Sequence, residues 1–164
     1  MRKVAAFLSV AGCFTLGAGA QPANLRTLDV CTLVPGATVA GVVGGRLVGT
    51  LPFRADDGTV NRCRYTVAPA GAEGDARDVY TVWVLHPDDF TGLKDGEEKP
   101  VTDVPGLGDG AFMGFHKEEG RYWLTVLVLR RATFQVTGES ADAVRKIANV
   151  ILPRLRARSD AARP

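Results

Sequence analysis

Serine and histidine are scarce in this chain, and their scarcity argues against two large classes of enzyme. Only Ser9, Ser140 and Ser159 are present, and none lies in a nucleophile elbow, which argues against a Ser-His-Asp hydrolase. The two histidines, His86 and His116, are far apart, and no local spacing supplies the further ligands of a metal site. We therefore expect no catalytic residue and no metal, and we place both histidines at strand ends as surface residues.

The chain also lacks a long apolar run after its N-terminus and a basic run in its body. Its longest strongly apolar stretch there covers residues 124–129, far short of the ~20 residues that cross a bilayer. Without the first 20 residues the basic count falls from 20 to 18, which equals the 18 acidic residues. Because phosphate binding needs clustered cations, this neutral domain argues against nucleic acid as a partner. The one cluster, Arg154, Arg156 and Arg158, is typical of a helix end.

The N-terminus has the layout of a secretory signal peptide. Arg2 and Lys3 precede an uncharged apolar stretch, and the small residues of an A-x-A site end at Ala20. We predict that residues 1–20 are cleaved before Gln21. The protein is then exported, to the periplasm or to the outside of the cell.

A second cleavage signal overlaps the first. The residues VAGC form a lipobox, which would place a lipid on Cys13 and anchor the protein to a membrane. We favour cleavage after Ala20, because the apolar stretch continues through Cys13 to Leu16, whereas a lipidated cysteine usually ends it. Lipidation of Cys13 stays the alternative.

Cysteine is limited to three residues, of which Cys13 is removed or lipidated in either case. Cys31 and Cys63 remain as an even pair in an oxidising compartment. Neither belongs to a C-x-x-C motif, and neither has a histidine nearby in sequence. The pair therefore predicts a structural disulfide bond, in preference to a reactive thiol or a metal ligand.

Apolar periodicity predicts an α+β domain over residues 21–156, followed by a disordered tail at 157–164. Consecutive strands on short turns favour antiparallel pairing in a single sheet of about five strands. A C-terminal helix with an N-cap at Ser140, interrupted at Pro153, and a shorter N-terminal helix are expected to pack on it. The predicted strands are 62–68, 79–85, 111–116, 122–129 and 133–137, and the N-terminal helix is 35–43. Alternation along 62–68 places Cys63 on the core face and Arg62 and Arg64 on the opposite face.

The strand at 122–129 is apolar on both of its faces, which indicates a central strand covered on both sides. The C-terminal helix can cover one face. The first helix, loops or another protein must cover the second, and we favour the chain's own loops.

The residues GLGDGA at 106–111 match a permitted form of the dinucleotide fingerprint. That fingerprint needs a strand before it and a helix after it, whereas Pro105 precedes this one and a strand-like segment follows. We therefore expect no cofactor and interpret the motif as a glycine turn that leads into a strand. Gly106, Gly108 and Asp109 are kept as a candidate binding loop.

Three segments, DVCTLVPGATVAGVVGG, RCRYTV and VPGLGDGAFM, precede a strand pair and an amphipathic helix. In this order the chain resembles a family of small bacterial exported proteins, many of them lipoproteins of unknown function, best known from actinobacteria. It departs from that family at residues 34–37, where a polar cap and an acidic residue are usual. The resemblance implies a disulfide and an envelope address, and it implies no activity.

Two classes of function follow from these observations. The first, which we prefer, is a non-catalytic envelope protein that binds a protein or a small ligand on its sheet or at the GLGD loop. The second is an enzyme of unrecognised type, with a cleft where Asp109 or His116 meets other ionisable groups. A membrane-tethered lipoprotein with a sensor or inhibitor role is a variant of the first.

Overall fold

The computed structural model describes residues 28–56, 58–71, 75–96 and 101–161, without the side chains of residues 159–161. The predicted signal peptide, its cleavage after Ala20 before Gln21, and the alternative at Cys13 lie outside these ranges and stay predictions. Among the described residues, no helix is both long and apolar enough to span a membrane.

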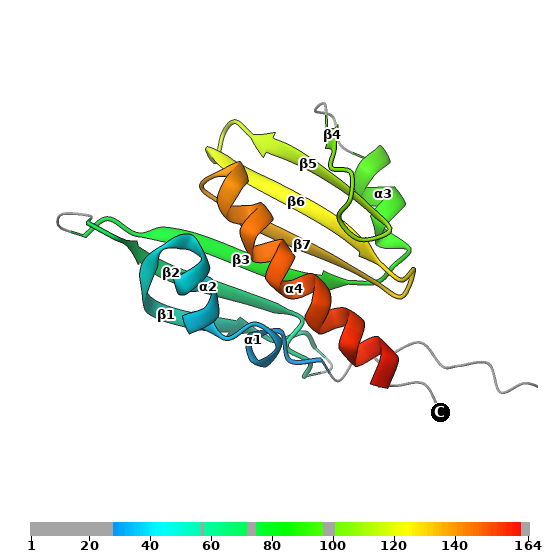
Figure 1. Cartoon of the computed structure of the whole chain (residues 1–164), viewed down its shortest axis with the longest axis horizontal. Helices are drawn as coiled ribbons and strands as arrows, with labels where there is room; N and C mark the ends of the chain where they lie inside the picture. Colours follow the sequence, from blue (N-terminus) through cyan, green and yellow to red (C-terminus); the bar gives the residue numbers. More distant parts are fainter. Residues whose placement is uncertain (1–27, 57, 72–74, 97–100, 162–164) are drawn as a thin grey trace, which may run out of the picture.

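The described chain forms one antiparallel sheet in an α+β arrangement (Figure 1). The sheet has seven strands in the order β1-β2-β3-β7-β6-β5-β4, two more than the predicted five. The strands are β1 (Gly45–Phe53), β2 (Arg62–Pro69), β3 (Asp78–Leu85), β4 (Thr102–Asp103), β5 (Gly110–His116), β6 (Arg121–Val128) and β7 (Ala132–Gly138).

The two additional strands, β1 and β4, are the two edges of the sheet, and both lie outside the five predicted strand segments. β1 carries two glycines and Pro52, which weaken any strand signal, and its alternation is broken by a bulge between Leu47 and Gly49. β4 has only two residues, both exposed. Edge strands of this kind are defined by pairing with a neighbour, and their own sequence says little about them.

Four helices are described. α1 (Val30–Leu33) and α2 (Gly36–Val43) form the N-terminal helical segment, α3 (Asp89–Asp95) follows β3, and α4 (Ala141–Ala161) ends the described chain. Gly44, which ends α2, has a φ of 76°, the left-handed conformation that glycine adopts without strain. Ser140 caps α4 as predicted, because its hydroxyl accepts a hydrogen bond from the Ala143 N–H at 3.1 Å.

The helix α4 continues through Pro153, where a kink or an end was expected, and it extends to Ala161, so residues 157–161 of the predicted tail are helical. Proline removes one helical hydrogen bond, but Pro153 faces solvent and the next turn is held by the fold. Leu155 is only 4% exposed, and the Arg154 side chain donates to the Leu33 carbonyl at 2.8 Å. Tertiary packing thus outweighs the proline.

The helices α1, α2 and α4 all lie on one face of the sheet, which we call the proximal face (Figure 1). Alternate residues of the central strands point into the space between sheet and helices and make the main core. The core includes the fully buried side chains Tyr65, Val82, Leu124, Val126, Phe134, Val136, Ile147 and Ile151.

The opposite face, which we call the distal face, receives only α3 among the described helices. The Phe90 ring of α3 contacts the Phe112 ring with centroids 5.1 Å apart, and Phe112 contacts Trp123 at 5.5 Å. α3 therefore covers the distal face over β5 and β6, where the sequence required a second cover. The N-terminal helix does not help, because α2 packs beside α4.

Candidate functional site

The predicted GLGD loop is a turn pressed against the end of β6, and it leads into β5 as expected. Gly106 and Gly108 have φ values of 80° and 66°, which favour glycine. A Cβ at Gly108 would collide with the Leu127 carbonyl oxygen. The Asp109 N–H donates to that same oxygen at 2.8 Å. The second glycine is therefore required by a close approach of two backbones.

The Asp109 carboxylate holds the neighbouring hairpin between β6 and β7. Its Oδ2 accepts a hydrogen bond from the Arg130 N–H at 2.9 Å. Leu129 and Arg130 both have φ near 50°, the conformation of the two central residues of a type I′ turn, which favours Asn and Gly. This turn is built without either residue type, and the Asp109 side chain supplies a hydrogen bond that favours it.

A shallow cleft of about 320 Å³ lies between the GLGD loop and α3. Phe90 and Lys94 line it from α3, and Lys94 Nζ contacts Asp103 Oδ1 of β4 at 2.7 Å. The only cation and both carboxylates of this lining are therefore already engaged within the protein. Ligand binding by Gly106, Gly108 and Asp109 stays a prediction, whereas their part in the turn is plain.

The two histidines lie apart, at strand ends. His86 is exposed, and its Nδ1 lies 3.2 Å from Asp88 Oδ2. His116, at the end of β5, lines a groove of about 210 Å³ with Glu119 and Arg121, so it does meet other ionisable groups. The remaining lining residues are Tyr122, Trp123, Gln135 and Thr137.

In this groove, hydrogen bonds and an ion pair are described for Arg121 and none for the Nδ1 of His116. The His116 Nδ1 is buried without a hydrogen-bond partner among the described residues. Arg121 is held by Glu139 at 2.9 Å and by the Val79 carbonyl. The groove has no serine or cysteine for a histidine to activate. In the part of the chain that the structure describes, no group of three or more metal-binding side chains occurs either.

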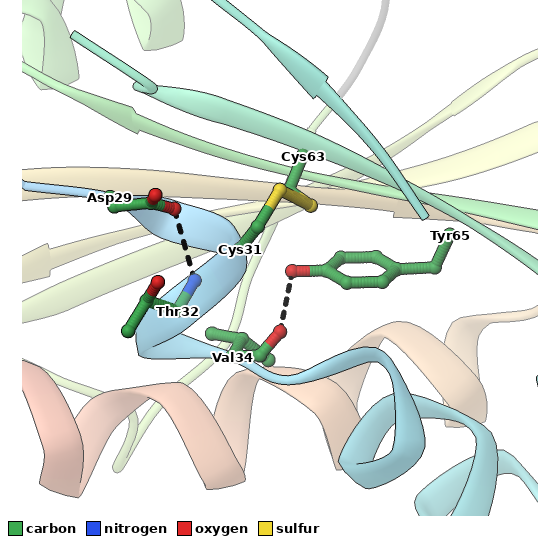
Figure 2. The surroundings of a disulfide bond; sticks show 6 residues. All are labelled: Asp29, Cys31, Thr32, Val34, Cys63 and Tyr65. Atoms are coloured by element: carbon green, nitrogen blue, oxygen red, sulfur yellow. Dashed lines mark hydrogen bonds between the residues drawn. A yellow bond between two sulfur atoms is a disulfide. The ribbon is translucent and has the colours of Figure 1, made fainter. Parts of the chain in front are cut away.

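The predicted disulfide is present and fixes α1 to the sheet (Figure 2). Cys31 and Cys63 have Cα atoms 5.3 Å apart, and Cys63 lies on the proximal face of β2, as its alternation predicted. The Asp29 carboxylate caps α1 by accepting from the Thr32 N–H at 3.0 Å. A helix of four residues has little stability of its own, so these ties account for its presence.

Tyr65 completes the same attachment from the core. Its hydroxyl donates to the Val34 carbonyl at 2.7 Å in a buried position (Figure 2). Burial, with a smaller contribution from Asp29, raises the pKa of the Tyr65 phenol above its usual range. The neutral phenol is a hydrogen-bond donor to the end of α1, which indicates a structural role.

The distal face carries the feature that sequence reasoning missed. In the register of the sheet, Phe53, Arg62, Trp83 and Gln135 lie side by side across β1, β2, β3 and β7. The Arg62 guanidinium lies 4.2 Å from the centre of the Phe53 ring and 5.6 Å from that of Trp83. The Arg64 guanidinium lies 5.0 Å from the Phe53 ring. We call Phe53, Arg62, Arg64 and Trp83 the arginine–aromatic cluster.

The cluster stands in a positively charged part of the sheet that none of the described helices covers. On the four neighbouring strands β1, β2, β3 and β7, the distal-face positions include Arg46, Arg62 and Arg64 and no carboxylate. None of the ion pairs in the described ranges involves these arginines. Alternation in β2 had predicted that Arg62 and Arg64 point away from the core. Their aromatic partner on β1 was missed together with that strand.

Comparisons with known proteins give no relative: no family model, no curated protein and no solved structure matches the chain. The resemblance to a family of exported proteins therefore stays a prediction.

Proposed function

We propose that this chain is an exported, non-catalytic binding module, and that it engages its partner with the distal face of its sheet. The observation that carries this proposal is the arginine–aromatic cluster on a sheet face that the described helices leave open between β1 and β7. Aromatic residues and arginine are the residue types most enriched at binding hot spots.

Two further observations support binding over catalysis. The charged groups that line the cleft between the GLGD loop and α3 already interact with other groups of the protein, in the Lys94–Asp103 pair and the Asp109–Arg130 hydrogen bond. The groove at His116 contains no serine or cysteine, and the His116 Nδ1 has no hydrogen-bond partner among the described residues. By contrast, the distal face offers cations that no described carboxylate neutralises.

Photo-crosslinking in cells that produce the full chain tests the proposal. A benzophenone amino acid replaces Thr81, which lies on the distal face between Arg64 and Thr137 in register. The matched control replaces Asn149, which is exposed on α4 on the other side of the molecule. We expect a covalent adduct of increased mass from position 81 and none from position 149. Absence of an adduct at 81, in a variant that unfolds like the wild type, would contradict the proposal.

A further inference from the structure

Resting on the proposed function, we infer that the partner at the distal face is a protein that presents carboxylates to Arg62 and Arg64. The charge of the distal face supports such a partner. Arg46, Arg62 and Arg64 lie on the distal face of two neighbouring strands with no carboxylate beside them on that face. An acidic partner surface complements this charge and is guided to it in solution.

The packing of Arg62 indicates which chemical group it is suited to bind. Its guanidinium is held between the rings of Phe53 and Trp83, so its plane is restrained before any partner arrives. A restrained guanidinium loses less side-chain entropy when it forms paired hydrogen bonds, and its fork of N–H groups matches a carboxylate. Arg64, which is exposed beside the same Phe53 ring, supplies a second cation one position along the face.

The shape of the face favours a protein over a small anion. Four strands of about eight residues present roughly 500 Å² of sheet surface, given the usual spacing of strands and residues. That area approaches the ~800 Å² that each partner buries in a standard protein interface. The distal side chains of β1, β2, β3 and β7 are aromatic, arginine, threonine, glutamine and aliphatic, and none is lysine. This composition is close to that of protein interface cores, where lysine and glutamate are depleted.

The free edge of the sheet is a poorer docking place than its face. β1 exposes Val48 and Leu51, at 45% and 51%, but its hydrogen-bonding edge is interrupted. The bulge between Leu47 and Gly49 breaks the pairing register, and Pro52 has no N–H to donate to an added strand. A partner strand or a second copy of this chain would therefore find few consecutive backbone groups on β1. We assign binding to the arginine–aromatic cluster.

The test uses two double variants of the full chain with the same change in net charge. Arg62→Gln with Arg64→Gln removes the cations of the cluster, and Arg145→Gln with Arg156→Gln removes two exposed cations of α4. Each is made in the chain that carries the photo-reactive residue at position 81. Thermal unfolding by circular dichroism checks that both variants fold as the parent does.

We expect the cluster variant to lower the yield of the adduct at least about tenfold, the effect of losing one charged hydrogen-bonded pair. We expect less than about a twofold change from the α4 variant. Added poly-L-glutamate should compete with the partner and lower the yield of the adduct. Added salt should also lower this yield, because it screens the exposed charges that bring the partner to the face. In vitro, poly-L-glutamate should shift the NMR signals of the Arg62 and Arg64 side chains in the purified wild type.

Several results would overturn this inference while leaving the proposed function in place. One is an adduct in which the molecule crosslinked to position 81 is a glycan without any peptide of its own. Another is an adduct whose yield is the same in the cluster variant as in the α4 variant. A third is competition by hyaluronate, a glycan carboxylate, without competition by poly-L-glutamate. Absence of any adduct from position 81 is a different outcome, because it removes the proposed function itself.

Discussion

Replacing Asp109 by alanine should destabilise the protein through a turn that Asp109 does not belong to. Its carboxylate accepts the Arg130 N–H at 2.9 Å, in a hairpin where Leu129 and Arg130 are both left-handed. For residues other than glycine this conformation costs about 1–2 kcal/mol per residue. The carboxylate is thus bonded to one of the two strained residues of the turn.

The expected magnitude follows from the hydrogen bond and the strain. A hydrogen bond to a charged group contributes about 1.5–3 kcal/mol, and the lower end applies because Asp109 is exposed. We therefore expect Asp109→Ala to lower the free energy of unfolding by about 1.5 kcal/mol. Arg130→Gly should raise it by about 0.5 kcal/mol, because relief of strain slightly exceeds the flexibility that glycine adds to the unfolded chain.

The decisive quantity is the coupling between the two changes. In the Arg130→Gly background only Leu129 stays strained, so the turn depends less on outside support and Asp109→Ala should cost about half as much. Urea unfolding monitored by tryptophan fluorescence gives all four free energies. Asp95→Ala is the control, since Asp95 is an exposed aspartate of α3 for which the described part of the chain gives no hydrogen bond or ion pair.

The reasoning would be refuted if Asp109→Ala cost no more than Asp95→Ala, or if its cost were unchanged in the Arg130→Gly background. In that case the carboxylate would be free for a ligand, as the candidate binding loop predicted. If Asp109→Ala instead lowers the free energy of unfolding by the expected amount and leaves crosslinking from position 81 unchanged, the GLGD loop has a structural role.

Three further predictions concern the core and the ties of α1. Replacing both Cys31 and Cys63 by alanine should lower the free energy of unfolding by about 3–4 kcal/mol, since the bridge closes a loop with a sequence separation of 32. Reduction of the wild type by dithiothreitol should lower it by a similar amount. An unchanged free energy of unfolding in either experiment would contradict this prediction. Tyr65→Phe should cost about 1–2 kcal/mol at neutral pH, because it leaves a buried carbonyl without its donor. The pKa of Tyr65 is raised in the folded state, so its contribution to stability is complete below roughly pH 10 and is lost at higher pH. The free energy of unfolding should therefore fall less steeply with rising alkaline pH in Tyr65→Phe than in the wild type. Equal slopes in the two proteins would contradict this prediction. Gly114→Ala should cost about 1–3 kcal/mol, because a Cβ there would overlap the Trp123 ring, and an unchanged melting temperature would show that the ring moves without cost.

Much of the fold was accessible from the sequence because period and capping agree with tertiary structure there. The alternation of Arg62 to Ala68 placed Cys63 on the core side, and the apolar stripe of α4 identified the main covering helix. Ser140 was recognisable as a cap from its position. In each case the local signal and the packed structure require the same residue types.

The rest depended on contacts between residues far apart in the chain. β1 becomes a strand because β2 pairs with it, and α4 passes Pro153 because Leu155 and Arg154 reach other elements. The role of Asp109 needed the position of Arg130, 21 residues later. The arginine–aromatic cluster likewise needed the register that sets Phe53 beside Arg62.

The strand order also sets the sequence in which the core can close during synthesis. β1, β2 and β3 form one group of neighbours, β4 to β7 form another, and the pairing of β3 with β7 joins them. The disulfide joins α1 to β2, and both precede the second group in the chain, so the bond does not need that group in order to form. The proximal face of the central strands, however, stays uncovered until the last helix, α4, is complete. A nascent chain that stops before residue 141 would therefore expose an apolar sheet surface, and it would be a target for aggregation and for chaperones.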